Sequence, residues 1–174
     1  ENSVAIIVQA RNKSTRLPGK VMKDLGGKPL LLFLIERLKR TKTVDDIIIA
    51  TTEDDSDDSL VNLAKDSGVI FVRGSVNNVL SRFVLASKKT KANILIRITG
   101  DSPLMDPFLI DNAVNLFSLN NYDYICNTNP PTYPDGLDIE VFSREALMMC
   151  NKYASTSFEK EHVTPWMRQS RLIS

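Results

Sequence analysis

The chain has 174 residues, of which 43% are hydrophobic, and its formal net charge is +1. This size and composition predict one domain with a substantial core, and the near-neutral charge excludes a global field that would draw it to nucleic acid. No apolar stretch reaches the length of a membrane-spanning helix, so we expect no membrane partner. The 2 cysteines, Cys126 and Cys150, lack a metal-binding spacing, which predicts reduced thiols and a cytoplasmic protein.

Four short apolar runs alternate with segments of helical periodicity. The runs cover residues 4–8, 47–50, 69–72 and 94–98. They are apolar almost throughout, as strands covered on both faces should be. The alternation predicts an α/β fold with right-handed βαβ units and a mostly parallel, doubly wound sheet. The helical apolar positions are Leu31, Leu34, Ile35 and Leu38, then Leu60, Leu63 and Ala64 before a stop at Gly68, then Ile110, Ala113, Val114 and Phe117.

A short cationic segment follows the first run. It contains Arg11, Arg16 and Lys20, together with the hydroxyl of Ser14 and a turn at Pro18-Gly19. In an open α/β sheet, ligands bind outside the carboxyl ends of the strands, and dense positive charge there suits a polyphosphate. The segment therefore predicts a nucleoside triphosphate site, although it matches neither the Walker A nor the G-x-G-x-x-G motif. A solvated basic turn is the alternative.

Acidic residues follow two other runs. Asp101 comes just after the fourth run, so it should share the carboxyl edge of the sheet with Arg11. A carboxylate facing a phosphate-binding loop is what Mg²⁺ requires, although Asp101 could instead only end a strand. We expect Asp106 to cap the helix that begins at Pro107, and the acidic run 53–58 to cap the helix after it.

The pattern changes after Tyr122, where a loop rich in Asn, Pro and Tyr leads into residues 137–141. Strict alternation there predicts a strand with Asp138 and Glu140 on one face. These carboxylates suit sugar hydroxyls or a cation, or they form a solvent-facing surface. The only histidine, His162, belongs to no H-E-x-x-H motif or triad, so a structural or substrate-contacting role is expected.

Together these segments resemble the CMP-sugar synthetases, the cytidylyltransferases that activate sialic, pseudaminic, legionaminic and KDO-type acids. The similarity is greatest to the spore coat polysaccharide biosynthesis protein F type. It rests on Gln9-Ala-Arg, Ser14-Thr-Arg-Leu-Pro-Gly-Lys-Val21, Arg97-Ile-Thr-Gly-Asp-Ser-Pro-Leu104, Tyr133-Pro-Asp-Gly-Leu-Asp-Ile-Glu-Val-Phe142 and Glu161-His-Val-Thr-Pro165.

The resemblance implies a Rossmann-like fold of the nucleotide-diphospho-sugar transferase type, with CTP and a sugar acid as substrates and Mg²⁺ as cofactor. It implies catalytic roles for Arg11, Lys20 and Asp101, the last as the metal ligand. The implied nucleotide-binding residues are Gln9, Ala10, Arg11, Ser14, Arg16, Lys20, Thr52, Arg73 and Arg82. Tyr133, Asp138, Glu140 and His162 fall on the implied acceptor-sugar side.

One departure from the family pattern concerns the metal site. Such enzymes usually continue through a segment with a second metal-binding aspartate and a closing helix, and no such aspartate follows Glu140 here. We therefore expect a single domain that lacks this C-terminal segment; substitution by Asp138 or Glu140, or impaired metal binding, are the other readings. The family often dimerises, which leaves a homodimer open.

Two other functions remain open at the level of sequence. A nucleotide-sugar-dependent glycosyltransferase would carry an Asp-x-Asp metal motif, but Asp55-Ser-Asp57 precedes a helix instead of ending a strand. A truncated, non-catalytic nucleotide-binding domain is the third reading. The sequence does not identify the sugar.

Overall fold

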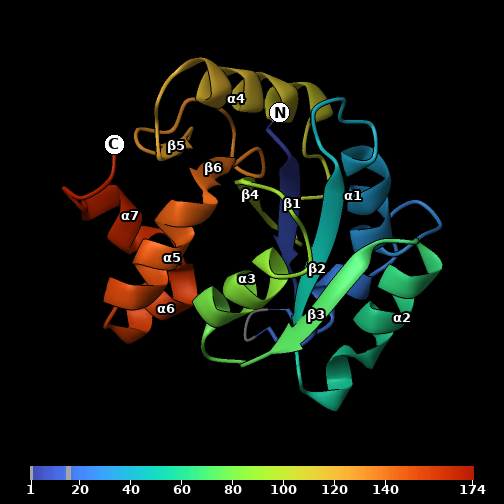
Figure 1. The fold of residues 1–174 in the computed structure, drawn as a ribbon. Coiled ribbons are helices and arrows are strands. Elements are labelled where there is room, and N and C mark those ends of the chain that lie inside the picture. The colour runs from blue at the N-terminus through green and yellow to red at the C-terminus, as the bar shows by residue number, and fades with distance from the viewer. Residues whose placement is uncertain (1, 15–16) are drawn as a thin grey trace.

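The computed structural model describes residues 2–14 and 17–174, which build a six-stranded sheet with helices packed around it (Figure 1). The order across the sheet is β3-β2-β1-β4-β6-β5, with β1 to β4 parallel and β6 antiparallel to both of its neighbours. The predicted mostly parallel, doubly wound α/β sheet is therefore confirmed. The strands are β1 (Val4–Gln9), β2 (Asp46–Thr52), β3 (Ile70–Gly74), β4 (Ile94–Thr99), β5 (Tyr124–Cys126) and β6 (Glu140–Ser143).

Helices connect the strands and extend the chain beyond the last one. They are α1 (Leu30–Leu38), α2 (Asp58–Asp66), α3 (Val79–Ser87), α4 (Pro107–Leu119), α5 (Arg144–Tyr153), α6 (Ser157–His162) and α7 (Pro165–Gln169), with 3-10 turns η1 (Lys20–Met22) and η2 (Asp55–Asp57). Figure 1 shows α5, α6 and α7 grouped together on the side of the molecule that carries the C-terminus. Among the helices formed by the described residues, none is long and apolar enough to cross a membrane.

Side chains of the central strands alternate between two hydrophobic cores. In β1, Ile6 and Val8 face the core that α1, α2 and α4 complete, whereas Ala5 and Ile7 face the core that α3 and α5 complete. All four side chains are fully buried. A strand covered on both faces needs apolar side chains at every position, which explains the continuous apolar runs of the sequence.

Helix boundaries follow the local signals that the sequence carries. Asp106 Oδ1 accepts the backbone N–H of Phe108 at 2.9 Å and caps α4, which begins at Pro107. Gly68 adopts a φ of 64° directly after α2, where its N–H donates to the Lys65 carbonyl. A positive φ is easiest for glycine, so this residue ends the helix as predicted.

The carboxyl ends of β1 and β4 lie unusually close together. Gly100 donates its N–H to the Gln9 carbonyl at 2.8 Å, and a Cβ built on Gly100 would lie 2.8 Å from the Ala10 Cβ. Only glycine fits this approach without a shift of the backbone. It brings Asp101, the next residue, beside the cationic loop that follows β1.

The predicted strand at residues 137–141 is corrected by the structure. Strand β6 begins only at Glu140, which is 2% exposed, while Asp138 is exposed. The Asn127 side chain binds the Leu137 carbonyl and the Ile139 N–H at 2.8 Å each, so these two backbone groups before β6 bond to a side chain and not to a neighbouring strand. Asp138 and Glu140 therefore do not share a solvent-facing strand surface.

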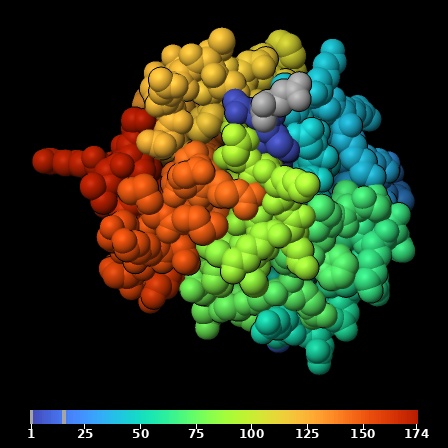
Figure 2. All heavy atoms as spheres, in the orientation of Figure 1, coloured from blue at the N-terminus to red at the C-terminus, as the bar shows by residue number. Residues whose placement is uncertain are grey.

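The C-terminal helices return to the body of the domain. Helices α5 and α6 pack against α3, and Figure 2 shows their orange spheres directly beside the green spheres of that region. This packing places residues from the end of the chain next to the carboxyl edge of the sheet.

Candidate active site

An ion pair lies at the carboxyl edge of the sheet. Lys20 Nζ lies 2.9 Å from Asp101 Oδ2, and their side chains are 39% and 43% exposed, so a ligand can reach both. Gly19, with a φ of 68°, donates its N–H to the Asn12 carbonyl at 2.8 Å and folds the loop back so that Lys20 faces Asp101. Partial burial opposes ionisation of Asp101, but the hydrogen bond and charge of Lys20, together with hydrogen bonds from Thr99 and the backbone, outweigh this and lower the pKa of Asp101.

A buried carboxylate anchors the cationic loop. Asp57 is 1% exposed, and its Oδ1 accepts the backbone N–H of Asn12 at 2.6 Å. Its Oδ2 accepts both the hydroxyl and the N–H of Thr52. The Asn12 side chain completes the anchor by donating to Ser59 Oγ at 2.9 Å. Sequence reasoning took the acidic run for a helix cap and missed this role, for which the only signal was the number of acidic residues before a short helix.

A polar cavity of about 520 Å³ opens beside the end of β1. Its lining residues are Gln9, Ala10, Arg11, Val76, Asn77, Val79, Arg82, Ser157, Glu161 and His162. The Arg82 side chain reaches it from α3 while only 2% exposed, and its Nη1 donates to the Ala50 carbonyl at 3.0 Å. Its buried Nε has no hydrogen-bond partner among the described residues.

The charges of this cavity favour an anion. Burial, and then repulsion by Arg11, lower the pKa of Arg82 to about 10, so the guanidinium stays protonated at neutral pH. A buried guanidinium beside a second cation is stabilised when a negative group binds between the two. A phosphate chain supplies such a group.

A second cavity, of about 600 Å³, lies on the other side of the same strand ends. It contains Lys20, Thr99, Asp101, Asp135 and Asp138. Thr99 pairs in register with Gln9 of the first cavity, so both cavities lie at the ends of β1 and β4. Partial burial and the neighbouring carboxylates of Asp135 and Glu140 raise the pKa of Asp138.

The donor set of this second cavity fits Mg²⁺. Its acidic lining offers carboxylate oxygens, and the half-exposed Asp101 lies beside Lys20. Within the described part of the chain, no cluster of three or more His, Cys, Asp or Glu side chains forms a complete metal cage. Mg²⁺ commonly binds one or two carboxylates and completes its shell with substrate phosphates and water, so this arrangement is sufficient.

Two further loop residues were predicted to bind phosphate. Ser14 is half-buried, and its Oγ accepts the N–H of Leu17 at a long 3.5 Å. Arg16 lies outside the described residues. The roles of both residues remain predictions.

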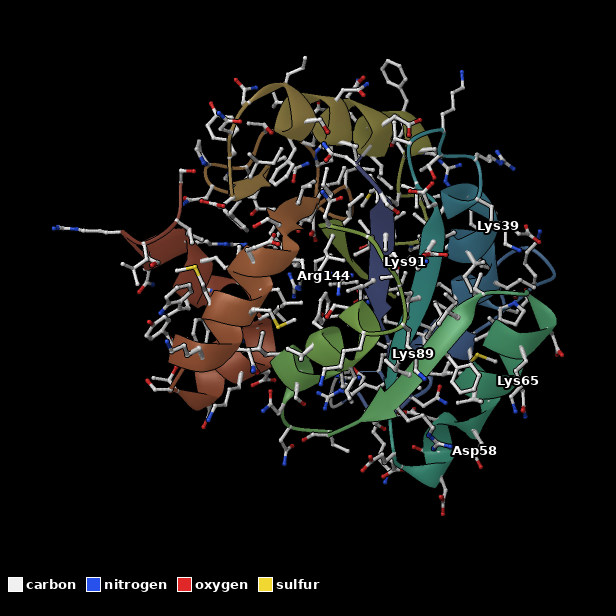
Figure 3. All side chains as sticks on the ribbon, viewed as in Figure 1. Lys39, Asp58, Lys65, Lys89, Lys91 and Arg144 are labelled. Carbon is white, nitrogen blue, oxygen red and sulfur yellow. The ribbon has the colours of Figure 1, made fainter. Side chains whose placement is uncertain are left out.

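Thr52 and Arg73, two residues predicted to bind nucleotide, make structural contacts within the chain, and their role in binding remains a prediction. The Thr52 hydroxyl is buried against Asp57, and Arg73 donates to the Thr52 carbonyl, the Asp54 carbonyl and the Asp58 carboxylate. Figure 3 shows Asp58 at the start of α2, close to the end of β3. Neither Thr52 nor Arg73 lines a cavity at the strand ends, because their polar groups hold the turn that anchors the loop.

The four predicted sugar-side residues are not brought together. His162 lines the cavity of Arg11 and Arg82, where its ring packs on Phe158 with centroids 4.5 Å apart. Asp138 lines the cavity of Asp101. Glu140 is buried with both carboxylate oxygens hydrogen-bonded, so it is not available to sugar hydroxyls.

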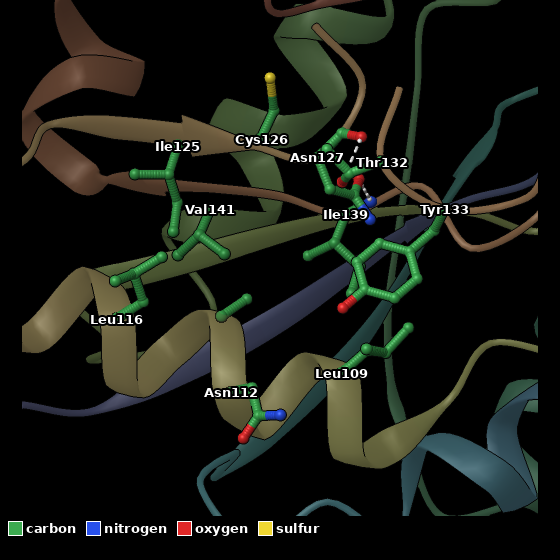
Figure 4. A pocket seen from close by; sticks show the side chains of 11 residues that line it. Leu109, Asn112, Leu116, Ile125, Cys126, Asn127, Thr132, Tyr133, Ile139 and Val141 are labelled. Atoms are coloured by element: carbon green, nitrogen blue, oxygen red, sulfur yellow. Dashed lines mark hydrogen bonds between the residues drawn. The ribbon is translucent and has the colours of Figure 1, made fainter. Parts of the chain in front are cut away.

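Tyr133 lies in a third, mostly apolar cavity of about 270 Å³ between α4 and the β5–β6 edge. Figure 4 shows its ring pointing toward Leu109 of α4, with Asn127 and Thr132 behind it. The side chain is 47% exposed. Sequence reasoning grouped Tyr133 with Asp138, but the structure assigns the two side chains to different cavities.

Comparison with known proteins places this site in a family. An uncharacterized protein of Methanocaldococcus jannaschii is 43% identical over 164 residues, which are 94% of this chain and 66% of that protein. Spore coat polysaccharide biosynthesis protein SpsF of Bacillus subtilis is 35% identical over 96% of this chain and 70% of its own length. A 3-deoxy-manno-octulosonate cytidylyltransferase of Chloroherpeton thalassium is 32% identical over 66% of this chain and 46% of its own length. The chain thus spans between 46% and 70% of the length of these relatives.

Solved structures and a family model agree with these relatives. A cytidylyltransferase from Leptospira borgpetersenii serovar Hardjo-bovis matches with a TM-score of 0.93 and 35% identity, over 98% of this chain and 72% of that one. A CMP:2-keto-3-deoxy-manno-octonic acid synthetase solved with CTP shares the fold, with a TM-score of 0.73 and 18% identity over 96% of this chain and 85% of that one. The cytidylyltransferase family model matches residues 5–173. With its cationic loop, its facing carboxylate and this match over nearly its whole length, the chain belongs to the cytidylyltransferase family.

Proposed function

We propose that this chain is the nucleotidyltransferase domain of a CMP-sugar synthetase. It transfers CMP from CTP to a hydroxyl of a sialic, pseudaminic, legionaminic or KDO-like sugar acid, releases pyrophosphate and serves surface polysaccharide biosynthesis. The observation that carries the proposal is the Lys20–Asp101 ion pair, which lines the 600 Å³ cavity at the carboxyl edge of the sheet. The polysaccharide and octulosonate relatives support the class of acceptor.

The reaction requires positioning and charge stabilisation more than a nucleophilic side chain. The acceptor hydroxyl attacks the α-phosphorus in line, the bond to the bridging oxygen breaks, and pyrophosphate leaves with the electron pair. The hydroxyl proton passes to solvent. Arg11 and Arg82 would hold the nucleotide in the 520 Å³ cavity, with Gln9 and Ala10 at its floor. Lys20 would stabilise the negative charge that develops on the phosphates near Asp101.

The metal would be held by Asp101 together with oxygens of the nucleotide. When bound, Mg²⁺ would neutralise phosphate charge that otherwise repels the incoming hydroxyl. Asp138 shares this cavity and remains a candidate for contact with acceptor hydroxyls, as does Tyr133 from the adjoining apolar cavity. His162 moves from the acceptor side to the nucleotide side in this proposal, because it lines the cavity of Arg11.

The glycosyltransferase alternative finds no support in the geometry. In Asp55-Ser-Asp57 the second carboxylate is 1% exposed and bonded to Asn12 and Thr52, so it offers no free oxygen to a metal. A nucleotide-binding domain without turnover would bind CTP but release no pyrophosphate. A measurement of pyrophosphate therefore distinguishes it from the proposed enzyme.

The test has a binding step and a chemical step. Thermal unfolding with CTP, UTP, GTP or ATP, each with Mg²⁺, should show the largest stabilisation with CTP, about 2.7 kcal/mol at a concentration of 100 times Kd. Pyrophosphate release should then require CTP and one of the four classes of sugar acid. Equal stabilisation by all four nucleotides would overturn the CTP assignment. Selective binding of CTP, with no pyrophosphate released from CTP in the presence of any of the acids, would favour the non-catalytic domain.

A further inference from the structure

Glu140, the first residue of β6, is a buried carboxylate with four donors. The residue is 2% exposed. Its Oε1 accepts from the Tyr124 hydroxyl, the Thr164 hydroxyl and Arg168 Nη2, each at 2.6 Å. Its Oε2 accepts from Arg97 Nη1. Two guanidinium groups therefore converge on one carboxylate, and attraction to Arg97, with these hydrogen bonds, lowers its pKa against the opposing effect of burial.

One contact of this carboxylate leads to the floor of the nucleotide cavity. Arg97 is the register partner of Glu140 in the β4–β6 ladder, and its Nε donates to Gln9 Oε1 at 2.9 Å. Gln9 lines the 520 Å³ cavity. The Arg97 guanidinium is thus held at one end by Glu140 while it fixes the Gln9 side chain at the other.

A second contact leads to another part of the same lining. Thr164 is 1% exposed, and its hydroxyl donates to Glu140 while its N–H donates to the His162 carbonyl at 2.8 Å. Between them, Val163 is held at a φ of 68°, which is rare for a β-branched residue and must be enforced by its surroundings. His162 lines the 520 Å³ cavity from α6. The bond to Glu140 therefore holds the turn that places His162.

We propose that Glu140 is a positioning residue that preorganises the nucleotide cavity by fixing Gln9 through Arg97 and His162 through Thr164. A change in a buried carboxylate between two guanidinium groups leaves those charges uncompensated and moves the side chains that depend on them. Neither Glu140 nor Arg97 lines the cavity, so the effect is transmitted through hydrogen bonds. The proposal rests on the proposed function only for the identity of the nucleotide.

The first test compares two hydroxyl deletions on the same carboxylate oxygen. Thr164→Val and Tyr124→Phe each remove one 2.6 Å bond to Glu140 Oε1, but only Thr164 belongs to the turn beside His162. Because the chain has 1 histidine, its ring NMR signals report on this turn without ambiguity and without any ligand. We expect Thr164→Val to shift the His162 signals well beyond any change in Tyr124→Phe. Equal signals in the two variants would overturn the link through Thr164.

The second test asks whether the network controls binding. Glu140→Gln is compared with Arg144→Met, which likewise removes a charged group that makes several hydrogen bonds. Arg144 donates to the carbonyls of Ser87, Thr90 and Ala92 and lies outside both strand-end cavities (Figure 3). Calorimetry with CTP and Mg²⁺, below the unfolding transition of every variant, should show on the order of tenfold or greater loss of affinity for Glu140→Gln and none for Arg144→Met.

The two tests distinguish a failure of the positioning role from a failure of the proposed function. Wild-type affinity for CTP in folded Glu140→Gln would overturn the positioning role. If Glu140→Gln does not fold, Thr164→Val takes its place in the calorimetry, with Tyr124→Phe as its control. If the wild-type chain binds no CTP, the proposed function fails, whereas the His162 signals still decide whether Glu140 positions this part of the cavity.

Discussion

Asp57 Oδ1 lies 2.6 Å from the backbone nitrogen of Asn12, so a buried carboxylate of η2 anchors the loop that carries Arg11 and Lys20. A backbone contact of this kind fixes the path of the chain, whichever rotamers the loop side chains adopt. The placement of Arg11 and Lys20 therefore depends on a residue that would not itself touch the substrate.

Replacing Asp57 should lower both stability and nucleotide binding. Asp57→Ala leaves the Asn12 N–H and the Thr52 hydroxyl without their acceptor, which should cost on the order of 2–3 kcal/mol in the free energy of unfolding. Urea denaturation measures this loss, and calorimetry with CTP measures the accompanying loss of affinity. Exposed Asp55, two residues earlier, provides the matched control, because Asp55→Ala should stay within about 0.5 kcal/mol of wild type. Equal stabilities of the two variants would contradict the anchoring role.

Removing the metal should weaken CTP binding through Asp101. In the wild-type chain, CTP should raise the unfolding temperature more with Mg²⁺ than with EDTA. In Asp101→Asn this metal-dependent increment should disappear, because one of the metal's oxygen ligands is lost. Asp106→Asn is the control: it lines the same cavity, but its carboxylate caps α4, a task that asparagine performs equally well. A full metal increment in Asp101→Asn would show that this carboxylate does not hold the metal.

The Glu140 network should make folding sensitive to acid. Since the folded pKa of Glu140 lies below its ordinary value of 4.5, its stabilising effect is complete above that value and is lost as pH falls through the folded pKa. Urea denaturation from pH 6 to pH 3 should show a steeper loss of stability for wild type than for Glu140→Gln. Other carboxylates contribute equally to both proteins, so the difference isolates Glu140. Parallel pH profiles would contradict the assignment of a lowered pKa.

The sheet could be predicted because its central strands are buried on both faces. Such strands need apolar residues almost throughout, as in residues 4–8 and 94–98. The Lys20–Asp101 encounter could also be anticipated, since both residues follow strands whose carboxyl ends share one edge. In the structure the two side chains face each other as predicted, with Lys20 Nζ 2.9 Å from Asp101 Oδ2.

The burial of Glu140 could not be predicted, because the alternation in residues 137–141 looks the same whether a strand faces solvent or a buried guanidinium pair. Its partners Arg97 and Arg168 are separated from it by 43 and 28 residues along the chain. The position of His162 likewise depends on the packing of α6 against α3, a tertiary contact without a local signal. The role of Asp57 could not be predicted, because it lies in a run of acidic residues of which Asp54 does cap the helical turn η2.

The central claim is that the cations of the loop after β1 bind the phosphates of CTP, and the most direct measurement is the CTP affinity of Lys20→Ala. Calorimetry with Mg²⁺ should show at least about a tenfold rise in Kd, or about 1.4 kcal/mol. Lys28→Ala, which removes a lysine paired with Glu36 outside both strand-end cavities, should bind CTP as wild type does. Unchanged CTP affinity in folded Lys20→Ala would contradict the account.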